Sequence, residues 1–409
     1  MLSYQKFTEK SHFFCLCCAI IIAIVAPIST AITSVGCVLM LVAWLFSGKV
    51  LASLTIAYQQ ATGKMILIFF VWLVIGTFYA ETSWHDKVDT LLSWKKFAYL
   101  FILLGLFHSK KWKGYFIHSY VSFMSLAALI GIVLWQLNIV VREGAGHDAG
   151  IFMTNYATQS TAFIAALLAC IFLRHETTST LKKQGLSLAI ALFIINIFFI
   201  SGARTAYFAL PIAVVFAVGS LYGYKKLPII MALASVFVLL LVVSSSTLQQ
   251  RVDEGLKEFN SYDSSPHISS IGVRVIFAKN TVELIKQRPL WGYGTSSFES
   301  TYGEYAASHY QGWRALTTTD PHNIYLYISL ENGLMGLLIF LIYLYVAFRQ
   351  GLQQDFYGKL AVSFLMTITV ASLFNAYFKT FPEGHLLAFF MGILLAYKPA
   401  LLLEKNTDA

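Results

Sequence analysis

Long apolar segments recur along the whole chain, separated by polar connections. Most approach the roughly 18 to 25 residues that a helix needs to cross a bilayer. Two of these segments adjoin near the N-terminus: the first covers about 13–28, and the second follows it and ends at Phe46. Ser29-Thr30-Ala31 between them resembles the cleavage site of a signal peptide. Because the second apolar segment follows at once, we predict two uncleaved helices. With these two, the pattern predicts twelve spans, the others lying near 64–80, 95–108, 114–136, 154–173, 186–201, 203–222, 227–245, 323–348, 359–379 and 383–403.

The apolar stretch from Leu186 to Tyr222 is too long for one span. As a single helix it would reach about 55 Å, against a hydrocarbon core of about 30 Å. Ser201-Gly202-Ala203-Arg204 is the polar, flexible break within it. The pattern therefore predicts a helical hairpin with Arg204 at a membrane surface.

A polar segment at about 246–322 separates the ninth and tenth predicted spans. Within it, apolar or small residues at 273, 276, 277, 281, 284 and 285 mark one face of an amphipathic helix, which Pro289 ends. We therefore predict nine transmembrane helices in 1–245, a helical loop domain in 246–322, and three transmembrane helices with a short tail in 323–409.

Composition agrees with this all-α, polytopic fold. Only 12% of the residues are charged and 57% are hydrophobic, whereas a soluble domain has about 25% charged residues. The net charge of +9 does not indicate nucleic acid, because the basic residues sit at helix ends near membrane lipid and form no stripe. Their bias toward alternate connections predicts that both termini are cytoplasmic and that the long loop faces outward.

His322 is the first candidate for chemistry. Asp320 as N-cap and Pro321 as the first helical residue predict a helix start. His322 then lies in the first turn, where the positive end of the dipole favours the neutral imidazole that a general base needs. Further along, Gly333 and Gly336 either give a substrate chain room to approach or pack another helix.

Two arginines are the next candidates. Arg204, between apolar helices, is either a site residue or a side chain that extends to the interface. Arg274 lies in the first turn of the predicted loop helix, which is unfavourable for a cation and indicates an external anion. Together with His322 they predict a phosphate clamp and a base.

Three further cations are candidate substrate-binding residues. Lys95 and Lys96 lie on the outward side, where they meet either a lipid phosphate or ordinary headgroups, and Arg288 is also explained as a helix-end cation. The chain has no Walker A loop, no Cys or His cluster and no HExxH. We expect no metal ion, nucleotide or cofactor.

Three motifs then resemble those of bacterial O-antigen ligases. Ser201-Gly202-Ala203-Arg204-Thr205-Ala206 resembles the family's "TRAT/SRAT" segment, and Asn260-Ser261-Tyr262 followed by Ser270-Ile271-Gly272-Val273-Arg274 resembles its "NSY…SLGxR" stretch. His322-Asn323, ten residues and then Gly333-Leu334-Met335-Gly336 resembles "HN…GLMG". The resemblance covers roughly 200–340 and points to the O-antigen ligase and polymerase superfamily.

The resemblance implies a GT-C-like sugar transferase in the bacterial inner membrane, with a periplasmic active site. Such an enzyme moves a preassembled glycan from undecaprenyl pyrophosphate to the lipid A–core, by a metal-independent, inverting reaction. At the matching positions, the resemblance implies that Arg204 and Arg274 bind the pyrophosphate and that His322 deprotonates the acceptor hydroxyl. It also implies that Asn323 and Gly333, in the matched motif, are substrate-binding residues. The family pattern has polar residues shortly after His-Asn, whereas this chain has Ile324-Tyr325-Leu326-Tyr327, so acceptor identity stays open.

Other readings remain. An O-antigen polymerase would use the same clamp to join two lipid-linked glycans. A protein O-oligosaccharyltransferase usually carries a soluble region after the last helix, and only about six residues follow Leu403. A twelve-helix transporter generally has a long cytoplasmic link between two halves and an acidic relay, neither of which this pattern predicts.

Overall fold

The computed structural model describes residues 2–144, 146–226, 228–229, 231–232, 236, 243, 246–261 and 268–399. Within these residues every regular element is a helix. Seven helices are long and apolar enough to cross a membrane, and a bent pair gives an eighth candidate. The chain is therefore an all-α, multi-pass membrane protein.

The described residues of the N-terminal half form ten α-helices and one π-helical segment. In order they are α1 (Leu2–Val25), α2 (Thr30–Leu45), α3 (Val50–Gln59), α4 (Ala61–Tyr79), α5 (Trp84–Ser93), α6 (Lys96–Leu106), α7 (Lys110–Gln136), α8 (Tyr156–Glu176), α9 (Thr180–Ile195), the π-helical η1 (Asn196–Ser201) and α10 (Arg204–Tyr222).

The described residues of the C-terminal half form six α-helices and two short 3-10 helices. These are η2 (Tyr224–Lys226), α12 (Ser246–Ser261), α13 (Ser270–Gln287), α14 (Phe298–His309), η3 (Gly312–Ala315), α15 (Ile324–Leu352), α16 (Phe356–Ala371) and α17 (Phe381–Leu395).

The predicted spans correspond to helices throughout the described chain, although several boundaries differ. The break between α9 and α10 falls where it was predicted, with Gly202 in the left-handed conformation at φ 63° and Arg204 as the first residue of α10. The predicted span at 227–245 lies outside the described residues except for 228–229, 231–232, 236 and 243. The total of twelve spans therefore stays a prediction.

One predicted boundary is wrong, and one helix was not predicted. The second span ends at Phe46 as predicted, since α2 ends at Leu45 with Phe46 as its C-cap. The chain then bends by 104° into α3, which was not predicted, through a turn that contains Gly48 at φ 66°. The predicted helix 359–379 ends at Ala371, and residues 372–380 form a loop, here called the α16–α17 loop. The sequence of this loop resembles a membrane span because it contains Ala376, Tyr377 and Phe378. These three residues are buried in the bundle.

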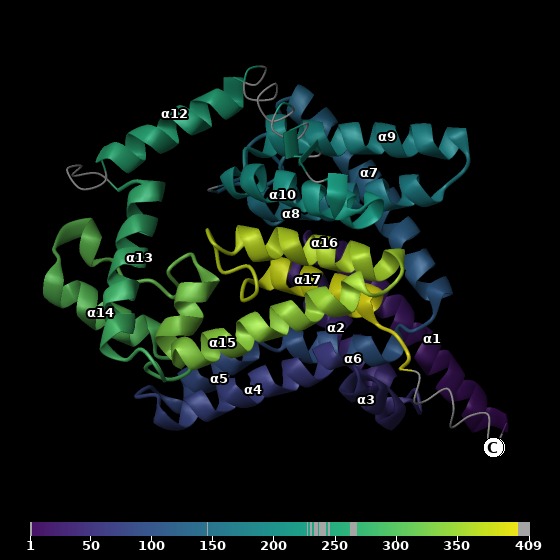
Figure 1. Cartoon of the computed structure of the whole chain (residues 1–409), viewed down its shortest axis with the longest axis horizontal. Helices are drawn as coiled ribbons and strands as arrows, with labels where there is room; N and C mark the ends of the chain where they lie inside the picture. The colour runs from purple at the N-terminus through teal and green to yellow at the C-terminus, as the bar shows by residue number, and fades with distance from the viewer. Residues whose placement is uncertain are drawn as a thin grey trace.

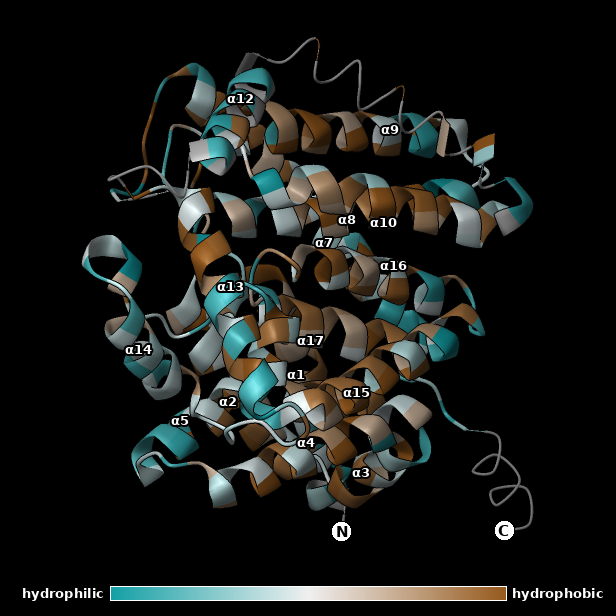
Figure 2. Ribbon diagram, turned by 60° about the vertical axis from the view of Figure 1, so that its left-hand side comes forward, coloured by the Kyte–Doolittle hydropathy of each residue, from teal (hydrophilic) through white to brown (hydrophobic). Residues whose placement is uncertain are grey.

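The helices α4, α15, α16 and α17 run side by side along the long axis of the molecule (Figure 1). Helix α16 also packs against α10, and α17 against α6. Brown, hydrophobic residues dominate these helices in Figure 2, and the teal residues gather mainly on α5, α13, α14 and the connections. Helices α12, α13 and α14 form a lobe at one end of the bundle, which we call the α12–α14 lobe.

A break in α15 attaches this lobe to the bundle. Gly333 lies inside the helix but has φ 63° and ψ −175°, a conformation that essentially only glycine adopts. The carbonyls of Leu330 and Glu331 accept hydrogen bonds from Tyr293 N–H (2.9 Å) and Gly294 N–H (2.7 Å), and Leu334 N–H donates to Pro289 O (2.8 Å). The segment after α13 is thus bound into the break like a short neighbouring strand.

Glu331 reinforces this attachment. Its side chain is buried, and Oε1 accepts hydrogen bonds from Ser296 N–H (3.1 Å), Phe298 N–H (3.4 Å) and the Tyr327 hydroxyl (2.8 Å). Phe298 is the first residue of α14, so the carboxylate satisfies N–H groups at a helix start. Glu331 therefore serves the packing of the lobe and does not contact His322.

Gly333→Ala should destabilise the protein by roughly 2 kcal/mol or more, because an alanine is strained at this φ and ψ. Its Cβ would also clash with the carbonyl of Leu290 and the amide of Trp291. We expect a clearly lower Tm in thermal unfolding of the detergent-solubilised protein. Gly185→Ala is the matched control, since its Cβ would have no atom within 4 Å; equal Tm values for the two variants would contradict this account.

Candidate functional site

Arg204 faces the α12–α14 lobe from the start of α10. Its Nη2 lies 3.4 Å from Glu254 Oε2 and 3.3 Å from Glu258 Oε1, both on α12. The side chain is only 23% exposed, so these carboxylates balance a charge that would otherwise be costly to bury. In the structure Arg204 is thus paired with acidic side chains of the α12–α14 lobe.

Glu258 joins Arg204 to the first turn of α13. Its second oxygen, Oε2, accepts the N–H of Ile271 at 2.8 Å. The hydroxyl of Ser269 caps the same helix by accepting Gly272 N–H at 3.0 Å. Arginine side chains and the N–H groups of a first helical turn both bind phosphate well. Glu258 contacts one group of each kind, so its carboxylate occupies a position suited to a phosphate oxyanion.

Arg274 lies one turn into α13, not in its first turn as predicted, because the Ser269 cap starts the helix three residues before Val273. Its side chain is half-buried, and no acidic group pairs with it in the described part of the chain. Arg274 therefore places a second positive charge on the cavity walls that Arg204 also lines.

Two cavities meet at the arginines. The first, of about 280 Å³, has mainly polar walls, and the second, of about 310 Å³, has mainly apolar walls. Arg204, Thr205 and Arg274 line both. The polar cavity is completed by Gly146, Asp148, Tyr156, Ala157, Ser201, Gly202, Glu254, Glu258, Ser270, Asn375 and Tyr377, and the apolar cavity by Phe208, Ile271, Val275, Ala278, Pro321, His322, Asn323, Leu373 and Phe374.

His322 lines the apolar cavity, but it is not inside α15. Its φ of 53° is left-handed, and the helix begins after Asn323, whose side-chain oxygen accepts Tyr325 N–H (2.9 Å) and Leu326 N–H (3.1 Å). Asp320 caps only the turn before it, by accepting His322 N–H at 2.8 Å. The predicted cap at Asp320 is therefore wrong, and so is the placement of His322 in the first helical turn.

The ring of His322 is held by its neighbours. It stacks on Phe277 of α13, with 6.1 Å between the ring centroids and 24° between the planes. Asn323 Nδ2 donates to Leu373 O at 3.0 Å, which ties the start of α15 to the α16–α17 loop. Asn323 thus acts as a cap at the cavity wall, with its amide already bonded to backbone.

The α16–α17 loop supplies site residues that sequence reasoning missed. Tyr377 shares a hydrogen bond with Thr205 (3.1 Å), beside Arg204, and Asn375 lines the polar cavity. Lys379 Nζ lies 3.4 Å from Thr319 O and 4.0 Å from the ring centre of Tyr327. Pro382, near the start of α17, was the available signal that the preceding residues form a loop.

Four other candidates do not reach the cavities. Lys96 is buried and donates to the carbonyls of Lys379 and Thr380, so its ammonium supports the α16–α17 loop instead of a substrate. Lys95 is the N-cap residue of α6. Arg288 stacks on Tyr293, 4.7 Å from its ring centre, and Gly333 serves the break in α15. No described group of three or more His, Cys, Asp or Glu could hold a metal ion.

The model of the O-antigen ligase family matches residues 188–341, which include Arg204, Arg274 and His322. The matched residues also include Ser269 and Asn323, the N-caps of α13 and α15. No curated protein matches the chain. The matched segment runs from α9 to α15 and so contributes both arginines and the histidine of the paired cavities. This finding confirms the resemblance to that family: residues 188–341 match the model of the O-antigen ligase family.

Proposed function

We propose that this protein is an O-antigen ligase of the bacterial inner membrane. It transfers a preassembled glycan from undecaprenyl pyrophosphate to a sugar hydroxyl of the lipid A–core on the periplasmic side. The observation that carries the proposal is the pair of arginines where a polar and an apolar cavity meet. A polyprenyl pyrophosphate has two matching parts, an apolar tail for the apolar cavity and a charged headgroup for the polar cavity.

The arginines would act on the leaving group. Planar guanidinium groups bind phosphate oxygens in pairs, and Arg204 and Arg274 approach the shared wall from α10 and α13. As the bond from the anomeric carbon to the pyrophosphate oxygen breaks, negative charge grows on that oxygen, and nearby cations stabilise it.

His322 would act on the acceptor. It shares the apolar cavity with both arginines, so one substrate can contact all three side chains. The acceptor oxygen bonds to the anomeric carbon, its proton passes to the imidazole, and undecaprenyl pyrophosphate leaves. A single displacement inverts the anomeric configuration, and no step requires a metal ion or a nucleotide.

The decisive experiment combines purified protein, undecaprenyl-pyrophosphate-linked glycan and lipid A–core, with EDTA and without nucleotide. The proposal expects a ladder of larger lipopolysaccharide on a gel. Growth of the lipid-linked glycan with a bare core would instead identify an O-antigen polymerase, and no change in either would favour transport.

Arg204→Ala, Arg274→Ala and His322→Ala should each lower the transfer rate by about 10²-fold or more, because each removes a group that stabilises the transition state. Lysine in place of either arginine should also work poorly, since it lacks the planar fork. Initial rates in the same assay measure this. Arg314→Ala, in the lobe but outside both cavities, is the control and should keep the parent rate.

Glu258→Gln should bind the donor more tightly. The Glu258 carboxylate holds both Arg204 and the N–H of Ile271, and a donor phosphate must replace it there. Removing its charge should lower the KM for the donor, and the inhibition constant of inorganic pyrophosphate, by roughly two- to tenfold. Glu304→Gln makes the same change on an exposed part of α14; weaker pyrophosphate inhibition in Glu258→Gln alone would contradict the competition.

A further inference from the structure

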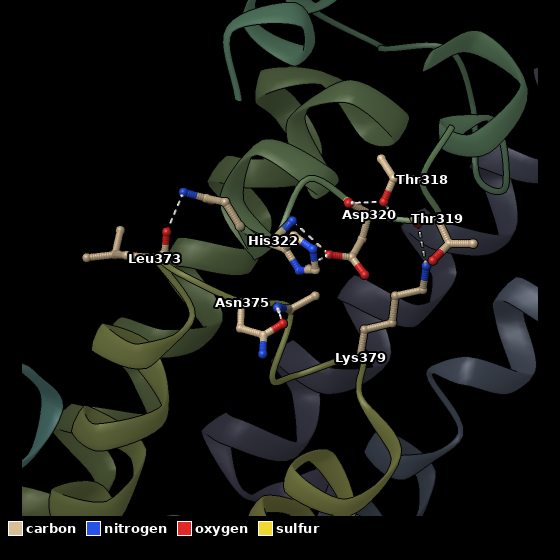
Figure 3. A network of polar contacts seen from close by, with 9 residues as sticks. Thr318, Thr319, Asp320, His322, Leu373, Asn375 and Lys379 are labelled. Atoms are coloured by element: carbon tan, nitrogen blue, oxygen red, sulfur yellow. Dashed lines mark hydrogen bonds and ion pairs between the residues drawn. The ribbon is translucent and has the colours of Figure 1, made fainter. Parts of the chain in front are cut away.

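The carboxylate of Asp320 faces the buried edge of the His322 ring, and Figure 3 shows it between His322 and Lys379. Asp320 Oδ1 lies 3.6 Å from His322 Nδ1 and accepts the backbone N–H of His322 at 2.8 Å. Nδ1 is buried and makes no hydrogen bond to any described residue. A small rotation of the ring would bring Nδ1 into hydrogen-bond range of a carboxylate already fixed by the backbone.

This geometry selects one tautomer of the neutral ring. A neutral imidazole carries a proton on one nitrogen and a lone pair on the other, whereas an ionised carboxylate only accepts hydrogen bonds. With the proton on Nδ1 the contact with Asp320 is attractive, and with a lone pair there it is repulsive. The lone pair is then on Nε2, at the opposite edge of the ring.

The surroundings keep this arrangement in place. Phe277 covers one face of the ring, and the Asn323 cap together with φ 53° at His322 fixes its backbone. The hydroxyl of Thr318 donates to Asp320 O at 2.7 Å, which closes the turn that carries the carboxylate. The ring therefore has little freedom to present its other edge.

Lys379 is a cation that interacts with the Asp320 carboxylate. Burial lowers the pKa of this lysine, while the charges of Glu331, Asp320 and Glu299 raise it. The lysine approaches Asp320 from the α16–α17 loop, on the side away from His322 (Figure 3). Among the described residues, Arg204 and Arg274 are the other charged groups that line the cavity of His322.

We propose that Asp320 is a positioning residue that holds the His322 proton on Nδ1 and leaves Nε2 to receive the proton of the acceptor hydroxyl. The inference rests on the proposed function for its catalytic part. During transfer the acceptor oxygen bonds to the anomeric carbon, the bond to pyrophosphate breaks and the hydroxyl proton moves to Nε2. Asp320 stays ionised and stabilises the resulting imidazolium.

Asp320→Asn separates this role from a purely structural one. Asparagine keeps an oxygen that accepts the His322 N–H, so the turn survives, but it removes the charge. We expect kcat to fall about 10²-fold with little change in the donor KM. The control is Glu304→Gln, which removes an exposed carboxylate of α14 outside both cavities and should stay near the parent rate.

A second readout does not depend on glycan transfer. Diethyl pyrocarbonate modifies a ring nitrogen that carries a lone pair, and mass spectrometry of the His322 peptide gives the rate at one alkaline pH. While Asp320 holds the proton on Nδ1, the lone pair of the neutral ring is on Nε2, at the edge away from the carboxylate. In Asp320→Asn the ring should shift partly to the tautomer whose lone pair is on the buried Nδ1, so the His322 peptide should react several-fold more slowly. Glu304→Gln should react at the parent rate.

The outcomes distinguish the two proposals. If the parent protein transfers no glycan but the His322 peptide reacts more slowly in Asp320→Asn, the proposed function fails and the Asp320–His322 pair stands. An unchanged modification rate would overturn the pair, whether or not transfer is lost, because Asp320 would then act only through the turn. Slower modification with the parent kcat would overturn the positioning role.

Discussion

The break in α15 is the constraint on which the site depends. A regular helix uses its carbonyls and N–H groups internally, but the conformation of Gly333 releases several of them to bind residues 289–294. That segment directly follows α13, so these bonds fix the helix that carries Arg274 and Phe277. The same α15 begins just after His322. One broken helix therefore sets how His322 lies relative to Arg274.

Arg204 reaches the site by a separate route, from the start of α10 after the π-helical segment and Gly202. Partly buried cations need nearby negative charge, and Glu254 and Glu258 supply it from α12. A pyrophosphate carries comparable charge and prefers the same partners. Under the proposed function, exchange of one anion for the other would leave Arg204 compensated throughout, and a charged product would leave without exposing an unpaired buried cation.

The sequence predicted the features that depend on local rules. The break at Ser201–Arg204 followed from length alone, and the end of α13 followed from Pro289. It did not predict where α15 starts, because Asp320 and Asn323 are both good caps three residues apart, and the choice depends on the tertiary bond from Asn323 to Leu373 O. The loop at 372–380 was hidden because burial makes Tyr377 and Phe378 resemble a membrane span. Lys96 was placed at the correct end of its helix, but periodicity could not show that it points inward.

These errors share a physical cause. The site is built mainly from residues at the ends of helices, where free N–H and carbonyl groups are available. Ser269, Glu258 and Asn323 satisfy those groups and also line or border the cavities. At such positions the side chain that ends a helix and the side chain that shapes a substrate site are often the same residue. A local signal then identifies the region, while only the three-dimensional contacts decide which of two neighbouring candidates closes the helix and which, like His322, turns toward the cavity.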